Sequence, residues 1–332
     1  MLRVAHTRGW YDHFNDRKIH TESTPRLGGV GIFVAFVLAS LTGLLVVGPG
    51  QGLAPWSIPT LLLILAGLFV IHGLGLYDDF VNLRAPLKFT IQLAAAGLVA
   101  GSGVTIRLID LPWLGTLSLP PVLAVALTVL WVVSISNAVN LIDGADGMAG
   151  GVALLAALFM AIIALAQGSL VAALPAAALV GALAGFLVYN LPPARIFMGD
   201  SGSLTLGFIL AVIPLLGLER GSAAGVPFAP LPVLTLLYIP ITDTLLAITR
   251  RLKRGLPVHA ADREHLHHRL MDRGFYARRL LAIVYTGMLV LGLSALGWYA
   301  LPATLAGPII LGVWAIALVL IMALGRKRSA GG

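Results

Sequence analysis

The sequence predicts an all-α membrane protein, a polytopic transmembrane helical bundle with about ten spans. Three observations carry this prediction: 58% of the 332 residues are hydrophobic, only 11% are charged, and the mean hydropathy is +0.95. Soluble domains carry about 25% charged residues, so this chain has too few charges to cover a water-soluble globule. Its apolar residues must therefore face lipid.

We expect a single integral membrane domain over residues 1–332, with a basic, histidine-containing cytoplasmic loop at 250–279. The net charge of +8 does not require nucleic acid as a partner, because membrane proteins gather Lys and Arg on the cytoplasmic side for insertion. The chain has no Cys, which excludes disulfides, thiolate metal sites and Cys nucleophiles.

A spanning helix needs about 20 mostly apolar residues, and ten stretches meet or approach that length. The stretches run over residues 27–47, 58–76, 87–104, 120–139, 148–166, 170–189, 204–218, 231–249, 280–300 and 303–324. The seventh stretch is short, and the third contains Gln92.

The distribution of basic residues orients these spans. If the first helix leaves the cytoplasm at Leu27, 20 of the 22 Lys and Arg residues lie inside, and only Arg107 and Arg220 lie outside. The positive-inside rule therefore predicts that both termini are cytoplasmic. Residues 1–26 are polar and have no apolar core, so they do not form a signal peptide.

The acidic residues show a second asymmetry. Twelve of the fourteen also lie on the cytoplasmic side, all except Asp110 and Glu219. Because acidic residues contribute little to topology, this gathering needs another cause. It predicts a polar site, the active site, at the cytoplasmic face.

Asp78 and Asp79 end the second span in the sequence GLYDDF. Adjacent carboxylates at a membrane edge repel each other unless a cation, a proton or an Arg relieves them, and the helix dipole disfavours Asp at a helix C-terminus. A solvated helix end is the alternative. A divalent cation would resolve the conflict.

The next inner loop, NAVNLIDGADGMAGG, places Asn137, Asn140, Asp143 and Asp146 at intervals of three. A continuous helix would not keep them on one face, but Gly144 and Gly147 allow the backbone to turn, so the amides and carboxylates can share a pocket. The alternatives are a structural turn with Asx caps and an EF-hand-like calcium loop. The latter lacks the length and the final Glu of that motif.

The third inner loop reads YNLPPARIFMGDSGSLTLG and contains Asn190, Phe197 and Asp200. Phe197 offers a flat apolar surface for stacking on a base. Asp200 precedes Ser-Gly-Ser at the start of a helix, where unpaired N–H groups attract phosphate. Alternatively, Asp200 or Ser201 caps this helix.

The fourth inner segment is the longest and most basic. Its Arg250, Arg251, Lys253 and Arg254 are expected to be positive-inside anchors. The histidines His265, His267 and His268 lie beside two further arginines, Arg263 and Arg269. Three His can bind zinc, but the neighbouring Arg residues favour an anion such as phosphate.

Two polar residues lie within predicted spans. His72, one turn before Asp78, is expected to pack between helices or to form a hydrogen bond inside the bundle. Asp243 lies in the eighth span, where a carboxylate is costly and usually faces the bundle interior. Its partner cannot be identified from sequence.

Together these groups indicate phosphoryl transfer at a membrane surface. Carboxylates do not hold phosphate directly, but a bridging Mg²⁺ reverses that repulsion. We therefore expect a diphosphate substrate from the cytosol and a lipid as the second substrate.

The motifs also resemble those of a known family, the polyprenyl-phosphate N-acetylhexosamine-1-phosphate transferases of glycosyltransferase family 4. The similarity extends over about residues 17–270 and rests on five motifs in the same order: TPRLGG, GLYDDF, NAVNLIDGADG, PARIFMGDSGS and DREHLHHRL. It implies transfer of a sugar-1-phosphate from a UDP-sugar to undecaprenyl phosphate, with release of UMP. It also implies a requirement for Mg²⁺, with Mn²⁺ as an alternative, and a place in a bacterial inner membrane.

The resemblance assigns roles residue by residue. Asp200 matches the Mg²⁺ ligand, and Asp78 and Asp79 match a catalytic pair that activates the lipid phosphate or assists the metal. The positions expected to bind the nucleotide sugar are Asn140, Asp143, Asp146, Asn190 and Phe197. Those expected to bind phosphate or sugar are Arg263, His265, His267 and His268.

The sugar and the pathway are the least determined features. TPRLGG and DREHLHHRL resemble the GlcNAc branch, so we expect UDP-GlcNAc and the first membrane step of a cell-envelope polysaccharide. Phospho-MurNAc-pentapeptide transfer in peptidoglycan synthesis is an alternative, and an ion-coupled transporter is one from a different class. The oligomeric state is open, with a homodimer as one arrangement. Relatives usually have another transmembrane helix before TPRLGG.

Overall fold

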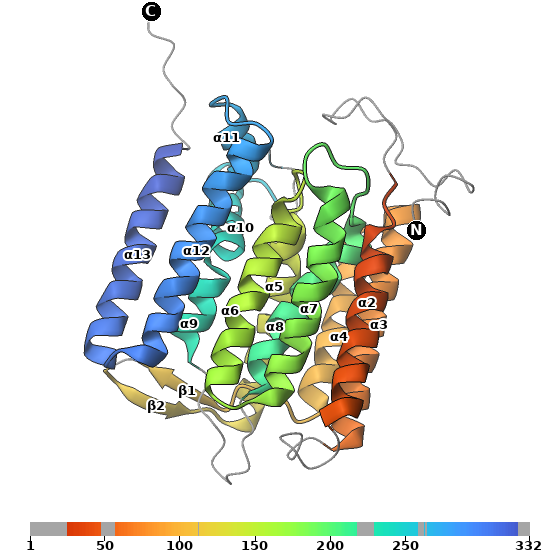
Figure 1. Cartoon of the computed structure of the whole chain (residues 1–332), viewed down its shortest axis with the longest axis vertical. Coiled ribbons are helices and arrows are strands. Elements are labelled where there is room, and N and C mark those ends of the chain that lie inside the picture. Colours follow the sequence, from red (N-terminus) through yellow and green to blue (C-terminus); the bar gives the residue numbers. More distant parts are fainter. Residues whose placement is uncertain are drawn as a thin grey trace, which may run out of the picture.

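The computed structural model describes residues 25–47, 57–111, 113–217, 229–257, 262 and 264–324. Long helices run side by side in one bundle, with α11 at one end and a β-hairpin at the other (Figure 1). We call these the α11 end and the hairpin end. The helices over the first six predicted spans are α2 (Gly28–Val47), α3 (Ile58–Val81), α4 (Ala85–Gly101), α5 (Pro121–Leu141), α6 (Met148–Ala166) and α7 (Leu170–Asn190). Those that follow are α8 (Gly199–Leu216), α9 (Pro230–Leu236), α10 (Tyr238–Lys253), α11 (Leu266–Met271), α12 (Arg278–Ala300) and α13 (Ala303–Leu324).

The all-α membrane fold is confirmed, with a helix at each of the ten predicted spans. Within the described residues, eight helices are long and apolar enough to cross a membrane. The helix at the third predicted span, α4, is not one of these eight. It has 17 residues, which at 1.5 Å per residue is about 25 Å, short of the roughly 30 Å hydrocarbon core.

The predicted eighth span, 231–249, is not one straight helix. It is the pair α9 and α10, bent by 82° at Leu237. Pro240 explains the break, because proline has no N–H to donate to the carbonyl of Leu236, four residues earlier, and its ring crowds that carbonyl.

The central helix is α8, and α2 and α13 lie at the periphery. In α8, 15 of 18 residues are buried, as expected of a helix surrounded by others. On α2, by contrast, Leu45 is 83% exposed. Such outward-facing apolar side chains fit a lipid environment, which confirms that this is a multi-pass membrane protein.

Polar and small residues allow helices to pack closely around α8. His72 of α3 stacks on Phe33 of α2 with ring centroids 4.0 Å apart, and its Nδ1 lies 3.2 Å from the hydroxyl of Thr205. This is the packing role predicted for His72. Gly75 of α3 touches α8 so closely that a Cβ there would be 2.6 Å from the carbonyl carbon of Asp200.

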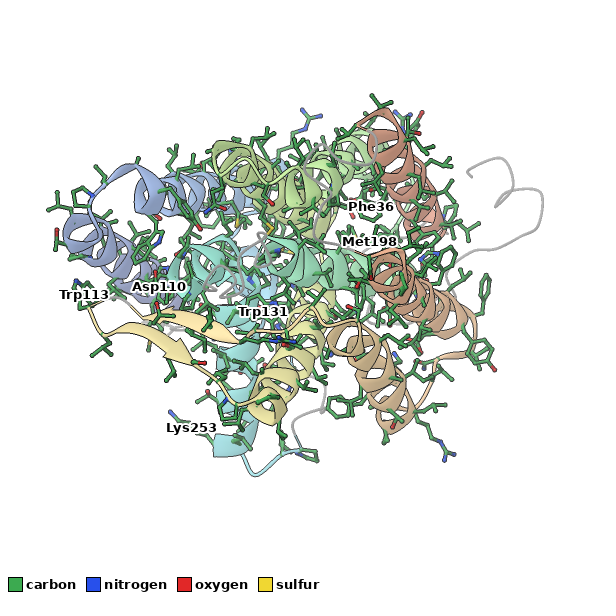
Figure 2. All side chains as sticks on the ribbon, turned by 90° about the horizontal axis from the view of Figure 1, so that it is seen from below. Phe36, Asp110, Trp113, Trp131, Met198 and Lys253 are labelled. Carbon is green, nitrogen blue, oxygen red and sulfur yellow. The ribbon has the colours of Figure 1, made fainter. Side chains whose placement is uncertain are left out.

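A short antiparallel hairpin covers the end of the bundle opposite α11. Strands β1 (Leu108–Leu111) and β2 (Gly115–Ser118) pair with Leu108 opposite Ser118. Figure 2, viewed along the bundle, shows this hairpin lying across the helix ends with Trp113 at the periphery. Trp113 is 60% exposed, a placement typical of aromatic residues at a membrane interface.

Candidate active site

The first part of the site forms where the C-terminus of α3 meets the N-terminus of α8. Asp79 accepts the backbone N–H groups of Asp200 and Ser201, at 2.7 and 3.0 Å. The unfavourable charge at the end of α3 is thus relieved by the unpaired N–H groups that begin another helix. Because Asp79 takes two of these groups, they are not free for phosphate, and the helix cap comes from Asp79 rather than from Asp200 or Ser201.

Asp78 and Asp200 share one cation, Lys88 of α4. The Lys88 ammonium forms an ion pair with Asp78, and its Nζ lies 3.2 Å from Oδ2 of Asp200. Asp78 also accepts the backbone N–H of Leu83 at 2.6 Å. Three elements therefore bring two carboxylates and one ammonium together at the α11 end.

Asn140, at the end of α5, belongs to the same cluster. Its Nδ2 lies 3.2 Å from Oδ1 of Asp200 and 2.8 Å from the hydroxyl of Ser203. Asn137, one turn earlier, does not reach the cluster. It instead exchanges hydrogen bonds with Gln92 of α4, which explains the polar residue that the third predicted span contains.

Asp143 lies in the loop between α5 and α6, among other acidic groups. Burial raises the pKa of Asp143 to about 7, and the negative charges of Asp200 and Asp79 act in the same direction, while Arg26 opposes them. The loop is thus electronegative, and the Asp143 carboxyl group gains or loses its proton near neutral pH.

Asn190 and Asp146 join this loop to the one between α7 and α8. Asn190 is 5% exposed and accepts the N–H of Gly147 at 2.9 Å, while its amide donates to the carbonyl of Ile196 at 2.8 Å. Asp146 accepts the N–H of Ala194 at 2.9 Å. These bonds shape the loops, and the contacts expected from both residues to a nucleotide remain predictions.

The TPRLGG segment pairs by its backbone with the segment that carries Phe197. The N–H of Phe197 donates to the carbonyl of Pro25 at 2.8 Å, and the N–H groups of Gly28 and Gly29 donate to the carbonyls of Phe197 and Met198 at 2.9 and 3.0 Å. The first and fourth motifs are therefore one structural unit. Phe197 is partly exposed, and its stacking on a base remains a prediction.

The histidines approach the cluster from the segment that begins α11. The His267 ring lies against Gly144, where a Cβ would come within 3.0 Å of its Nδ1 and closer to its other ring atoms. His267 is stacked parallel to His265, with centroids 6.1 Å apart, and lies 4.1 Å from the His268 ring. Burial and the nearby His268 and His265 lower the pKa of His267 to about 3, so His267 is neutral at pH 7.

Two of the basic residues expected to be membrane anchors, Arg250 and Arg254, form ion pairs with acidic residues that precede α11. Arg250 binds Asp262 through two hydrogen bonds of 2.6 and 3.2 Å, and Arg254 pairs with Glu264. Arg269, expected near an anion, donates to the carbonyl of Ile321 at the end of α13, at 3.2 Å. A further candidate, Arg263, lies outside the described residues.

The carboxylates of this cluster suit Mg²⁺, which needs few protein ligands, better than a metal ion bound by protein side chains alone. Among the described residues, no group of three His, Asp or Glu side chains is arranged to hold a metal ion. Asp78 and Asp200, however, present carboxylate oxygens around a single cationic group, Lys88. Mg²⁺ is usually bound by one or two carboxylates together with water and substrate phosphates, so these residues fit that ion.

Three residues of this region are not among the site residues predicted from the sequence. Lys88 stands in the first turn of α4, where the helix dipole disfavours a cation, and this misplaced charge is the signal that would have identified it. For Gly144 the sequence indicates only a flexible position, and for Asp243 it identifies no partner. The roles of Gly144 and Asp243 depend on contacts with the histidine segment and α11. That segment lies more than 20 residues beyond Asp243 in the sequence.

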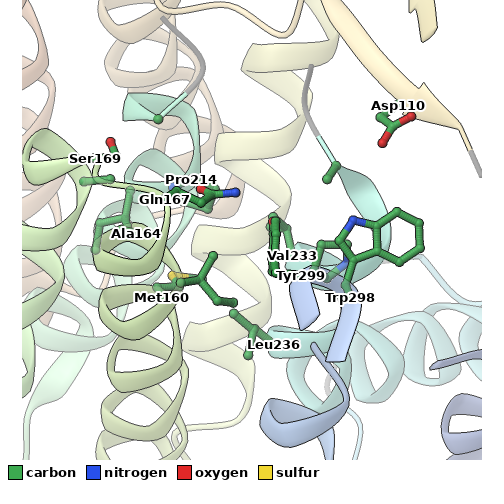
Figure 3. Close-up of a pocket in the computed structure, with 16 residues that line it drawn as sticks. Asp110, Met160, Ala164, Gln167, Ser169, Pro214, Val233, Leu236, Trp298 and Tyr299 are labelled. Carbon is green, nitrogen blue, oxygen red and sulfur yellow. The ribbon is translucent and has the colours of Figure 1, made fainter. Parts of the chain in front are cut away.

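A separate cavity of about 240 Å³ lies near the hairpin end of the bundle (Figure 3). It is mostly apolar, with Asp110, Gln167, Trp298 and Tyr299 among its lining residues, and it contains none of the predicted site residues. The candidate active site is therefore the cluster at the α11 end, where the chemically active side chains gather.

Comparisons with known proteins identify the family of this chain. Residues 61–218 match the model of glycosyl transferase family 4. The chain is 35% identical over 294 residues to a probable undecaprenyl-phosphate N-acetylglucosaminyl 1-phosphate transferase of Bacillus subtilis, covering 89% of this chain and 78% of the relative. It is 35% identical over 300 residues to the decaprenyl-phosphate N-acetylglucosaminephosphotransferase of Mycobacterium tuberculosis, covering 85% and 73%.

A more distant relative is the undecaprenyl-phosphate alpha-N-acetylglucosaminyl 1-phosphate transferase of Escherichia coli K12. It is 28% identical over 289 residues, covering 85% of this chain and 74% of the relative. The matched family region includes GLYDDF, NAVNLIDGADG and PARIFMGDSGS, the motifs that build the carboxylate cluster. The chain therefore belongs to glycosyl transferase family 4, the superfamily of polyprenyl-phosphate N-acetylhexosamine-1-phosphate transferases.

Proposed function

We propose that this protein transfers N-acetylglucosamine-1-phosphate from UDP-N-acetylglucosamine to undecaprenyl phosphate and releases UMP. The observation that carries the proposal is the meeting of five motifs at one end of the bundle. The first motif pairs with the fourth, the second and third contact Asp200 of the fourth, and the fifth packs on Gly144 of the third. The relatives named above are all described as N-acetylglucosamine-phosphate transferases acting on a polyprenyl phosphate.

The chain's own residues divide the work in a way that the sequence left open. Asp79 is a positioning residue, because both of its carboxylate oxygens hold the first turn of α8 and thereby Asp200. Asp78 and Asp200 are the carboxylates that would hold Mg²⁺, together with phosphate oxygens of the nucleotide sugar. Bound Mg²⁺ supplies charge neutralisation for the diphosphate and for the departing UMP.

The reaction is a phosphoryl transfer. An oxygen of the lipid phosphate forms a bond to the β-phosphorus of the UDP-sugar, and the bond from that phosphorus to the bridging oxygen breaks, so that UMP leaves with this oxygen. Such transfers depend on positioning and electrostatic stabilisation rather than on covalent protein chemistry. Lys88 and the histidine segment place positive and hydrogen-bonding groups around the transferred phosphate, while Asp143 and Phe197 contact the uracil.

The α11 end is proposed to face the cytoplasm of a bacterial inner membrane, where nucleotide sugars are found. The positive-inside distribution of Lys and Arg supports this orientation. The product, a lipid-linked sugar, would be the first membrane intermediate of a cell-envelope polysaccharide.

One assay tests the proposal directly. Purified protein is incubated with undecaprenyl phosphate and, separately, UDP-GlcNAc and other UDP-N-acetylhexosamines, and UMP release is measured with and without Mg²⁺. We expect release that depends on both the lipid phosphate and Mg²⁺ and is fastest with UDP-GlcNAc. Absence of turnover with every UDP-sugar would refute the proposal.

A substitution at Asp200 tests the metal assignment. Asp200→Asn keeps the size of the side chain but removes its charge, so we expect activity to fall by at least about 100-fold, as for the loss of a charged group that stabilises a transition state. Near-normal activity at saturating Mg²⁺ would exclude Asp200 as a metal ligand. A transporter is not favoured, because the clustered carboxylates lie at one end of the bundle.

A further inference from the structure

Asp243, which belongs to none of the five motifs, is buried where α10 meets the start of α11. It is 2% exposed. Its Oδ2 lies 2.8 Å from Nδ1 of His265, and its Oδ1 accepts the backbone N–H of Leu266 at 2.8 Å. A buried carboxylate is costly unless its oxygens are paired, and here both are.

This pairing determines which nitrogen of His265 is left for another partner. An ionised carboxylate only accepts hydrogen bonds, so Nδ1 of His265 carries the hydrogen. Nε2 has no hydrogen-bond partner among the residues that the structure describes. A carboxylate that binds one ring nitrogen of a histidine fixes the orientation of the ring. The direction in which the other ring nitrogen points is then fixed as well.

The same contact connects α10 with the carboxylate cluster. The rings of His265 and His267 are parallel, at an angle of 3°, and His267 lies on Gly144 between Asp143 and Asp146. Asp243 therefore contacts His265, whose ring is parallel to that of His267, and His267 packs on Gly144 in the loop of the third motif.

We propose that Asp243 is a positioning residue for the transfer reaction, which holds His265 so that Nε2 contacts a phosphate oxygen of the nucleotide sugar. This inference rests on the proposed function. It assigns a role in the reaction to a residue of α10, outside the loops that carry the motifs.

Asp243→Asn is the central variant. An asparagine offers one acceptor oxygen and places its NH₂ group against the other donor, so the His265 ring or the start of α11 loses its anchor. We expect kcat to fall at least about tenfold, because a displacement of about 1 Å in a catalytic group can cost about 100-fold. The KM for UDP-GlcNAc should stay within threefold.

Thr244→Val is the matched control. Thr244 is the next residue of α10, and its hydroxyl is buried without a hydrogen-bond partner, so its loss should leave kcat and thermal stability unchanged. A loss of activity in both variants would indicate a general sensitivity of α10 and would overturn the proposal.

A double-mutant cycle separates positioning of His265 from a structural role. If Asp243 acts through His265, Asp243→Asn combined with His265→Gln should be no worse than His265→Gln alone, within about twofold. Multiplied losses would overturn the proposal.

Leu266→Pro provides an independent variant if Asp243→Asn fails to fold. Leu266 is the first residue of α11, a position that tolerates proline, and the preceding His265 has the extended backbone that proline requires. This substitution removes the N–H bound to Asp243 but keeps the His265 contact, so kcat should match that of Leu266→Ala. A much lower kcat than in Leu266→Ala would show that Asp243 acts as a helix cap and would overturn the proposal.

A spectroscopic measurement keeps the inference separate from the proposed function. In protein labelled with ¹⁵N-histidine, the ring signals lost in His265→Gln identify His265, and Asp243→Asn should shift them while Thr244→Val does not. Unchanged His265 signals in Asp243→Asn would overturn the inference. Failure of the wild-type protein to release UMP would refute the proposed function, and the ring signals would still decide whether Asp243 orients His265.

Discussion

The contact between His267 and Gly144 leads to a sharp prediction, because it leaves no room for a methyl group. A Cβ at residue 144 would come within 3.0 Å of Nδ1 of His267 and closer to Nε2 and Cε1, whereas ordinary contacts begin at about 3.4 Å. The backbone of Gly144 has no positive φ, so alanine is not excluded by backbone strain. The effect of Gly144→Ala therefore acts through the histidine.

The magnitude follows from the distance that the ring must move. To restore an ordinary contact, the His267 ring must retreat by about 1 Å, and displacements of that size at catalytic groups cost about 100-fold in rate. His267 is 3% exposed and is flanked by the rings of His265 and His268, so its neighbours must shift with it. We expect the kcat/KM of Gly144→Ala to fall by about 100-fold.

The assay is UMP release from UDP-GlcNAc with undecaprenyl phosphate, and the control is Gly185→Ala in α7. A Cβ at Gly185 meets nothing within 4 Å, so the same chemical change should leave activity unchanged and slightly favour the helix. Thermal unfolding in detergent checks that both variants are folded. If Gly144→Ala keeps kcat/KM within threefold of the control, the histidine segment does not contribute to the site as described.

Three further predictions concern the carboxylates and their supports. Lys88→Met removes the ammonium that competes with Mg²⁺ for two carboxylates, so half-maximal UMP release should need less Mg²⁺; a higher requirement would contradict this. Because burial raises the pKa of Asp143 to about 7, its ionised form is lost as the pH falls from 8 to 6. The kcat/KM for UDP-GlcNAc should therefore fall over that range, and Asp143→Asn should flatten the profile; an unflattened profile would exclude Asp143 as the titrating group. Gly75→Ala forces a Cβ to 2.6 Å from the carbonyl carbon of Asp200, whereas Gly73→Ala meets nothing within 4 Å. The former should lower Tm and activity and the latter neither, and equal Tm values would show that α3 and α8 separate at little cost.

The sequence determined the membrane fold and the face on which the polar residues gather. Hydropathy and length identify a spanning helix because lipid leaves no alternative for backbone hydrogen bonds, and a helix lies at each of the ten predicted spans. The bend between α9 and α10 was missed. Pro240 was visible in the sequence, but proline in a membrane helix is tolerated when neighbouring groups satisfy the freed backbone, so its position alone did not predict an 82° break.

The tertiary structure decided how the carboxylates are paired. The sequence could show that Asp78 and Asp79 are adjacent, but not that Asp79 faces the first turn of α8 while Asp78 faces Lys88. These partners come from helices packed side by side, and helix packing depends on side-chain shape over the whole interface. The residues next to Asp78 and Asp79 in the sequence therefore do not predict this pairing.

Asp243 shows the same limit most clearly. Its cost as a buried carboxylate is evident from the sequence, because burial of a charge is penalised at any position inside a bundle. Its partner, His265, lies 22 residues further along the chain, beyond any helical spacing. Only the tertiary structure brings the two together, and the ion pair of Arg250 with Asp262 is a second contact between α10 and the described residues that precede α11.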